Sequence, residues 1–380
     1  MSPLTLNQVA SIVRKTLRIR AMALILFSGV LVAALTMFGA ATGYAGAAAS
    51  WSTPKSIDAQ SPYGLSSVSC ASADFCVAVD SNGYALTYDG SAWSTPQNID
   101  SSHHLFSVSC VSNSYCAAVD GVGNVLTFNG SVWSAPQRIV NGDTLSSVSC
   151  DSTVYCMAVS WGGFAFTMTG SVWSSPGLID SSGNLFGVSC PRSSGAESCA
   201  IVGGSGGSNS GQAFVYNGNT STGIGVVSNG SLYGVSCPSE IFCAAVDLNS
   251  DVLLKNGVTW SSPDVIDTGY DMTSVSCPSA TFCVAVDNNG NAMTYNGASW
   301  STPNVIDSGY WLTSVSCPSA TFCAAVDNYG RATIFSEASA TTTSTFAKTK
   351  SFKQTISCHK GTKILKVTGK HPKCPHGYKR

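Results

Sequence analysis

Short runs of alternating apolar and polar residues recur along this chain and are separated by turn residues. Residues 273–307 show the pattern clearly, with the runs T-S-V-S-C, F-C-V-A-V, A-M-T-Y and W-S-T-P-N-V-I in that order. Alternation of this kind is typical of half-buried β-strands. Asn288-Asn289-Gly290 and Asn296-Gly297 favour tight hairpins between the runs, because Asn and Gly accept a positive φ. The pattern predicts four antiparallel strands, with the proline-containing fourth run at an edge.

The same unit occurs seven times at a step of about 40 residues, apart from one longer step. A unit of this size cannot bury its own apolar face and must pack against neighbouring copies. Four antiparallel strands per unit predict an all-β fold, a seven-bladed β-propeller over residues 50–337. The first cysteines of the seven copies are Cys70, Cys110, Cys150, Cys190, Cys237, Cys277 and Cys317.

The repeat region begins and ends partway through a unit. It begins with the run W-S-T-P at Trp51, which is a fourth strand that precedes any complete unit. The last unit ends at Phe335, after its third strand, and has no such run of its own. The N-terminal strand 51–58 should therefore join the last blade and close the ring, a permutation that an open solenoid does not need.

The fourth copy departs from the pattern. Its cysteines, Cys190 and Cys199, are separated by eight residues instead of five, and the glycine-rich residues 203–211 enlarge its next turn. Sequence drift in a blade that tolerates insertions explains this departure, and so does a widened loop that borders a binding site. The sequence leaves both explanations open.

Charge is unevenly distributed along the chain. Residues 1–50 carry four basic residues and no acid, residues 51–337 carry five basic and 20 acidic residues, and residues 338–380 carry ten basic residues and no acid. A basic start, an apolar run and then small residues are typical of a signal peptide over residues 1–49. An uncleaved membrane anchor is the alternative. Either places the repeats outside the cytoplasm, so we expect a secreted or cell-envelope-associated protein.

Each repeat carries a cysteine pair, and an eighth pair lies near the C-terminus. Cysteines on either side of a short turn fall opposite each other on adjacent strands, and an exported protein keeps such pairs oxidised. One pair offers two ligands where a structural zinc needs four, so we expect disulfides and no metal. The expected bridges are Cys70–Cys76, Cys110–Cys116, Cys150–Cys156, Cys190–Cys199, Cys237–Cys243, Cys277–Cys283, Cys317–Cys323 and Cys358–Cys374.

The strand order places ten aspartates of the A-V-D and I-D motifs on one face of the ring, opposite the cysteine turns. The A-V-D aspartates are Asp80, Asp120, Asp247, Asp287 and Asp327, and the I-D aspartates are Asp58, Asp100, Asp180, Asp267 and Asp307. One interpretation is a rim that binds a cation or a polyhydroxyl ligand. The other is that each aspartate opens a turn by accepting backbone hydrogen bonds. Aromatic residues near this rim suit either sugar stacking or packing between blades: Tyr63, Phe106, Tyr233, Tyr270, Tyr310 and Trp311.

The sequence points to no catalytic residues, because no Ser/His/Asp or Cys/His set and no phosphate loop stands out. The propeller's three arginines, Arg138, Arg192 and Arg331, occupy unrelated repeat positions and should not converge. We therefore expect a non-catalytic binding or scaffold protein that needs no cofactor, with a glycan or a cell-envelope polymer as its ligand. The alternative is a secreted hydrolase that cleaves a glycan or another polymer with two of the aspartates.

The C-terminal segment is basic and holds the eighth cysteine pair. After a linker at 338–352, residues 353–380 contain I-S-C-H-K-G and P-K-C-P-H-G-Y-K. This segment resembles a short two-cysteine C-terminal motif of secreted bacterial proteins, and the repeats resemble those of secreted bacterial β-propellers. Its charge should attract an anionic envelope polymer, while zinc binding by Cys358, Cys374 and nearby histidines is the alternative to a disulfide. We expect a monomer that binds no nucleic acid and contacts a membrane only through an uncleaved N-terminus.

Overall fold

The described part of the chain consists of β-strands and turns. The computed structural model describes residues 49–61, 63–101, 103–181, 183–192, 198–205, 210–218, 221–337, 354–369 and 372–380. The expected signal peptide or anchor lies outside these residues except for Ala49, and so does the expected linker. Within the described ranges, no helix is long and apolar enough to cross a membrane.

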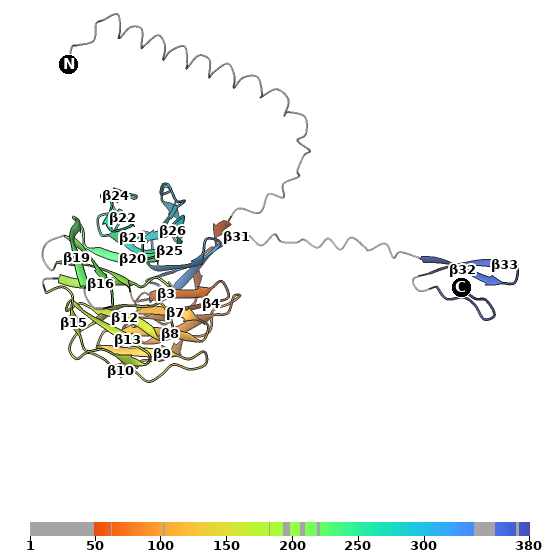
Figure 1. Cartoon of the computed structure of the whole chain (residues 1–380), viewed down its shortest axis with the longest axis horizontal. Coiled ribbons are helices and arrows are strands. Elements are labelled where there is room, and N and C mark those ends of the chain that lie inside the picture. Colours follow the sequence, from red (N-terminus) through yellow and green to blue (C-terminus); the bar gives the residue numbers. More distant parts are fainter. Residues whose placement is uncertain are drawn as a thin grey trace, which may run out of the picture. The chain divides into compact units, whose positions relative to one another are not determined.

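Seven antiparallel sheets follow one another around a closed ring (Figure 1). The first strand of each blade contacts the first strand of the next, and the first strand of the seventh blade contacts that of blade one. The all-β, seven-bladed β-propeller predicted from the repeats is therefore confirmed. Blades are numbered here from the one that begins at Leu65.

Within each blade the first three strands run in chain order from the centre of the ring outwards, and the fourth follows them in every blade except blade seven. The first strands are β3 Leu65–Ser72, β7 Leu105–Ser112, β11 Leu145–Cys150, β16 Gly183–Ser189, β20 Leu232–Ser239, β25 Met272–Ser279 and β29 Leu312–Ser319. The second strands are β4 Phe75–Asp80, β8 Tyr115–Asp120, β12 Tyr155–Ser160, β17 Cys199–Ser205, β21 Phe242–Asp247, β26 Phe282–Asp287 and β30 Phe322–Asp327. The third strands are β5 Tyr84–Tyr88, β9 Asn124–Phe128, β13 Phe164–Thr169, β18 Gly211–Tyr216, β22 Asp251–Asn256, β27 Asn291–Tyr295 and β31 Arg331–Glu337.

The outer strands are short in every blade except blade four. They are β6 Gln97–Asn98, β10 Gln137–Arg138, β14 Val172–Trp173 with β15 Gly177–Leu178, β19 Ser221–Ser228, β23 Thr259–Trp260 with β24 Asp264–Val265, β28 Asn304–Val305, and β1 Ala49–Trp51 with β2 Lys55–Ser56. The last two, β1 and β2, pair with β31, so both ends of the repeat region build blade seven. Trp51 lies opposite Phe335, and their ring centroids are 5.5 Å apart. The predicted closure of the ring is confirmed.

Most outer strands are broken where the sequence predicts one continuous run. In blade one, Trp93 forms a single bridge with Tyr88, and regular pairing resumes only at β6. The proline between the two pairings cannot donate to the ladder. Ser94 spans part of the gap, because its N–H donates to the Thr87 carbonyl and its hydroxyl accepts from the Thr87 N–H. The equivalent serine hydroxyls in other blades are those of Ser134, Ser174, Ser261, Ser301 and Ser52.

The serines of the S-V-S-C motif join neighbouring blades. Every buried backbone N–H needs a partner, and the inner edge of each first strand has no further strand to supply one. The hydroxyls of Ser107 and Ser109 accept from the N–H groups of Val148 and Cys150 in the next blade, at 3.2 and 3.0 Å. The serine-to-cysteine bond recurs at all seven junctions. The motif therefore specifies the ring as well as the strand.

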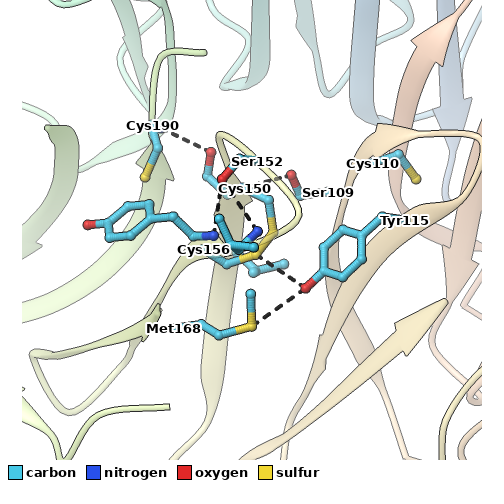
Figure 2. The surroundings of a disulfide bond; sticks show 12 residues. Ser109, Cys110, Tyr115, Cys150, Ser152, Cys156, Met168 and Cys190 are labelled. Atoms are coloured by element: carbon cyan, nitrogen blue, oxygen red, sulfur yellow. Dashed lines mark hydrogen bonds between the residues drawn. A yellow bond between two sulfur atoms is a disulfide. The ribbon is translucent and has the colours of Figure 1, made fainter. Parts of the chain in front are cut away.

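The hydrophobic core is divided among the junctions between blades, where the second strand of one blade packs against the next blade. All eight predicted disulfides form. The seven blade disulfides lie in these cores. Figure 2 shows Tyr115 of blade two beside the Cys150–Cys156 disulfide of blade three, with its hydroxyl 3.7 Å from the Cys156 sulfur and 3.5 Å from that of Met168. Eight disulfides indicate an oxidising compartment outside the cytoplasm.

The C-terminal segment contains a separate hairpin, β32 Gln354–Lys360 with β33 Lys363–Gly369. The Cys358–Cys374 disulfide ties the following residues to it, and His359 pairs through its backbone with Lys379. Cys358 is fully buried, whereas the described basic side chains are exposed: Lys360, Lys363, Lys366, Lys373, Lys379 and Arg380. The hairpin thus presents its charge to solvent.

Candidate ligand-binding face

The two faces of the propeller differ in their exposed side chains. The aspartate-turn face is formed by the turns between second and third strands and by the loops that lead to the next blade. In the described propeller, the well-exposed aromatic side chains all belong to this face: Tyr63, Trp161, Tyr233, Tyr270, Trp311 and Tyr329. The well-exposed hydrophobic residues at turns of the opposite, disulfide face are aliphatic, such as Val132, Val154 and Ile241. Aromatic exposure is therefore one-sided.

A cavity of about 340 Å³ lies where the seven first strands meet. Hydroxyl groups line much of it, including those of Ser66, Ser107, Ser146, Thr273 and Thr313. Three of them donate to a backbone carbonyl of the next blade and keep their oxygen lone pairs as acceptors: Ser146, Thr273 and Thr313. The sector of blades four and five differs, because glycine replaces the first serine of the S-V-S-C motif there. Backbone and apolar groups of Gly187, Val188, Gly234 and Val235 line that sector.

Two aromatic pairs border this cavity. Phe106 and Trp161 meet edge to face at 5.3 Å, and Phe186 and Tyr233 stack at 4.6 Å. Trp161 and Tyr233 are each 42% exposed, so both have ring surface available to a ligand. His104 stacks on Phe106 at 4.0 Å, and burial lowers its pKa, which favours the neutral imidazole. The cavity thus combines flat apolar surfaces with neutral hydrogen-bonding groups.

A second aromatic group lies at blade seven on the same face. Tyr310 and Tyr329 meet edge to face at 4.8 Å, and the Arg331 guanidinium lies 3.4 Å from the centre of the Tyr310 ring. Trp311 is 59% exposed, and its backbone N–H donates to the side chain of Asn328 in the adjacent turn. These rings extend the aromatic character of the face beyond the cavity.

The ten aspartates of the A-V-D and I-D motifs also belong to this face, and all are buried. Asp287 shows the role of the A-V-D residues, since its Oδ1 accepts the backbone N–H groups of Asn289 and Asn291 at 2.9 and 2.7 Å. The same two acceptor contacts occur at Asp80, Asp120, Asp247 and Asp327. These bonds favour the turn-forming interpretation. Ligand binding through these carboxylates stays a prediction.

The two aspartate sets meet in pairs between blades. The I-D aspartate of one blade lies within hydrogen-bonding reach of the A-V-D aspartate of the next in four junctions, which are Asp58–Asp80, Asp100–Asp120, Asp267–Asp287 and Asp307–Asp327. Burial raises the pKa of Asp80, Asp100 and Asp287, and the neighbouring carboxyl raises each further. Blade four has no I-D motif. At its junction with blade five, the hydroxyl of Ser228 donates to Asp247 instead.

Arg331 bridges one of these pairs. Its Nη2 lies 2.5 Å from Asp307 Oδ1 and its Nε lies 2.6 Å from Asp327 Oδ2. Burial and the neighbouring Asp327 nevertheless raise the pKa of Asp307 to about 7, against the lowering effect of Arg331. The other two arginines contact different groups, Arg138 the side chain of Asn141 and Arg192 the carbonyl of Cys110. Their contacts agree with the expectation that the three do not form an arginine triad.

The sequence did not single out Trp161, Phe186 or Tyr329 as part of this face. Trp161 and Tyr329 occupy the turn after the second strand, where other copies carry mostly serine, asparagine or glycine, apart from Val122 and Leu248. An aromatic residue in a polar turn position was the available signal. Phe186 lies at the same position of its strand as Phe106 and Tyr233, so comparison between the repeats could have found it.

No family model matches the sequence, and no curated protein matches it. Among solved structures, Ycf48 bound to a D1 peptide has a TM-score of 0.59 at 13% identity, covering 75% of this chain and 96% of that chain. Ycf48 from Cyanidioschyzon merolae has a TM-score of 0.58 at 14% identity, with 75% and 99% covered. The WD40 β-propeller domain of Doa1 has a TM-score of 0.62 at 11% identity, with 76% and 97% covered. At these identities the similarity shows the fold alone, a β-propeller, which commonly serves as a binding scaffold.

Proposed function

We propose that this chain is a non-catalytic extracellular binding protein that holds a neutral glycan on its aspartate-turn face. The observation that carries the proposal is the gathering of exposed aromatic rings around a hydroxyl-lined cavity on that face. Ligand sites commonly combine apolar and aromatic walls with a few polar groups that fix orientation. Burial of the ten aspartates withdraws their charge from the surface, which favours an uncharged ligand.

Tyr233 and Trp161 provide the sharpest test of this site. Removing a stacked ring should cost about 1.5–3 kcal/mol of binding, which is roughly a 10- to 150-fold loss of affinity. The full chain is screened on a glycan array, and the affinity of each hit is measured for wild type, Trp161→Ala and Tyr233→Ala. Val154→Ala, on the disulfide face, is the matched control and should bind as wild type does.

Peptides are the competing ligand class, because one structural neighbour, Ycf48, binds a D1 peptide. A peptide library screened beside the array separates the two classes. Binding to peptides alone, or equal glycan affinity in wild type and both ring variants, would contradict the proposal. Release of shortened glycans during the assay would favour the hydrolase instead.

The basic C-terminal hairpin supports retention at the envelope. Its exposed lysines and Arg380 form a positive surface that attracts anionic polymers in a salt-dependent manner. The full chain should sediment with isolated cell envelopes at low salt and be released as salt is raised. A chain that ends at residue 337 should remain in the supernatant, and equal sedimentation of both forms would exclude this role for the hairpin.

A further inference from the structure

Asp100, His103 and Asp120 form a cluster at the junction of blades one and two. Asp100 ends the outer segment of blade one, His103 lies in the loop that follows, and Asp120 ends β8 of blade two. His103 Nδ1 lies 3.0 Å from Asp100 Oδ1, and one ligand atom from each of the three residues lies within 4.8 Å of the others. Among the described residues, no other His, Cys, Asp or Glu group meets this criterion.

The two carboxylates are buried and unequally satisfied. Asp120 Oδ1 accepts the backbone N–H groups of Val122 and Asn124 at 3.0 and 2.7 Å, and its Oδ2 accepts the Asn124 side chain at 2.6 Å. Asp100 is 3% exposed, and its Oδ2 receives no hydrogen bond from the described part of the chain. A buried carboxylate oxygen beside a second carboxylate is stabilised by a shared proton or by a positive charge near it.

The junction of blades six and seven shows what such a pair can hold. The equivalent carboxylates there, Asp307 and Asp327, share the Arg331 guanidinium. In blade two, Asn124 stands at the repeat position of Arg331, so the chain supplies no cation at that point. His103 has no counterpart either, because Tyr310 occupies its position beside Asp307.

We propose that Asp100, His103 and Asp120 bind a divalent transition-metal ion, with Zn²⁺ as the preferred ion. Two carboxylate oxygens and one imidazole nitrogen are ligands that Zn²⁺ accepts, and water completes the coordination. Two ligand atoms about 2.1 Å from one tetrahedral ion are about 3.4 Å apart, so the His103 Nδ1–Asp100 Oδ1 separation of 3.0 Å would widen by a few tenths of an ångström on binding. The backbone and Asn124 bonds to Asp120 would orient that carboxylate. The bound ion would link the loop that contains His103 to blade two.

Zinc binding by the full chain tests this site. The histidines of the C-terminal segment are first replaced by His359→Gln, His371→Gln and His376→Gln, so that they contribute no zinc affinity. After chelator treatment, this background chain is titrated with Zn²⁺ by calorimetry, and its thermal unfolding is followed with and without Zn²⁺. We expect one ion per chain and a higher unfolding temperature with zinc.

His103→Gln should weaken zinc binding by about 10-fold or more and abolish the zinc-dependent rise in unfolding temperature. His104→Gln is the matched control, because its ring points to Ser66 and stacks on Phe106. Asp287→Asn, in a junction whose pair has no histidine, is a second control. Zinc affinity that is equal in the background chain and in His103→Gln, or no zinc binding by the background chain, would overturn the proposal.

Discussion

At the scale of single residues, the A-V-D aspartates of this propeller accept backbone hydrogen bonds from buried positions, and most of them lie close to a second carboxyl group. Each A-V-D carboxylate fixes a turn through two backbone N–H groups, and in four junctions a second buried carboxyl faces it. Two carboxyl groups that share a buried site do not both ionise readily. A carboxyl whose pKa is raised in this way keeps its proton to a higher pH than an isolated carboxyl does.

The pH dependence of stability should reveal a proton held by Asp307. Because its folded-state pKa of about 7 lies above the ordinary value of 3.8, the folded protein binds a proton that the unfolded chain has released between about pH 4 and pH 7. The free energy of unfolding should then fall as pH rises through that window, by at most about 1.4 kcal/mol per pH unit from this residue. Asp307→Asn removes the titration, so urea unfolding of the variant should show a smaller loss of stability from pH 4.5 to 7.5.

Asp89 provides the control for that measurement. It is exposed in a turn, where hydrogen bonds from Ser91 and Ala92 lower its pKa to about 2, so it stays ionised throughout the window. Asp89→Asn should leave the pH dependence of stability as in wild type. The same pH dependence in wild type and Asp307→Asn would show that Asp307 does not hold the proton.

At the scale of the element, the S-V-S-C strand combines three functions in four positions. Its valine and cysteine fill the core between blades, its serines accept N–H groups of the next blade, and its cysteine bonds to the paired strand. Burial of the sulfurs has a chemical consequence, because thiol–disulfide exchange needs access of the attacking thiolate. The disulfides of the blades and of the C-terminal hairpin should therefore differ in reactivity.

Reduction under native conditions should begin at Cys358–Cys374. The blade cysteines are at most 6% exposed, whereas Cys374 is half-buried. With dithiothreitol at neutral pH followed by alkylation, mass spectrometry should first find labels on Cys358 and Cys374, and on the blades only when denaturant is added. Once reduced, each blade should lose about 2–2.5 kcal/mol according to the chain-entropy model. Early labelling of blade cysteines, with the hairpin still oxidised, would contradict this order.

The elements were predictable where the signal was local and repeated. The strands, hairpins and cysteine pairs follow from alternation, Asn-Gly turns and the spacing of Cys70 and Cys76, all within one unit. The broken outer strands were not predicted, because the serine contacts at Ser94 depend on the third strand beside it. The aspartate pairs and the cluster of Trp161 with Phe106 join different blades. Such contacts depend on the curvature of the ring, which no single unit encodes.

At the scale of the whole molecule, the seven junctions repeat one construction with local exceptions. A serine-to-cysteine bond crosses every junction. Aspartate pairs cross four junctions of the described propeller, because blades three and four lack an A-V-D motif and blades two and four lack an I-D motif. As in a solenoid, each blade packs against its neighbours. Here, however, β1 and β2 join blade seven, so the repeat region has no free end. Each blade consequently has two neighbours, and stability depends on the strand that closes the circle.

Deletion of residues 49–58 tests that dependence. Without β1 and β2, the strand β31 becomes an exposed edge with unpaired backbone groups, and Phe335 loses Trp51. Such an edge promotes pairing with other chains, so the shortened propeller should unfold at a lower temperature and aggregate on heating. A chain that ends at residue 337 keeps the closure and should unfold as the full chain does. Joining residues 49–58 after Glu337 through an Asn-Gly turn would rebuild the same antiparallel pairing from the other end and should restore the unfolding temperature. An unchanged unfolding temperature after the deletion would mean that the ring does not depend on its closing strand.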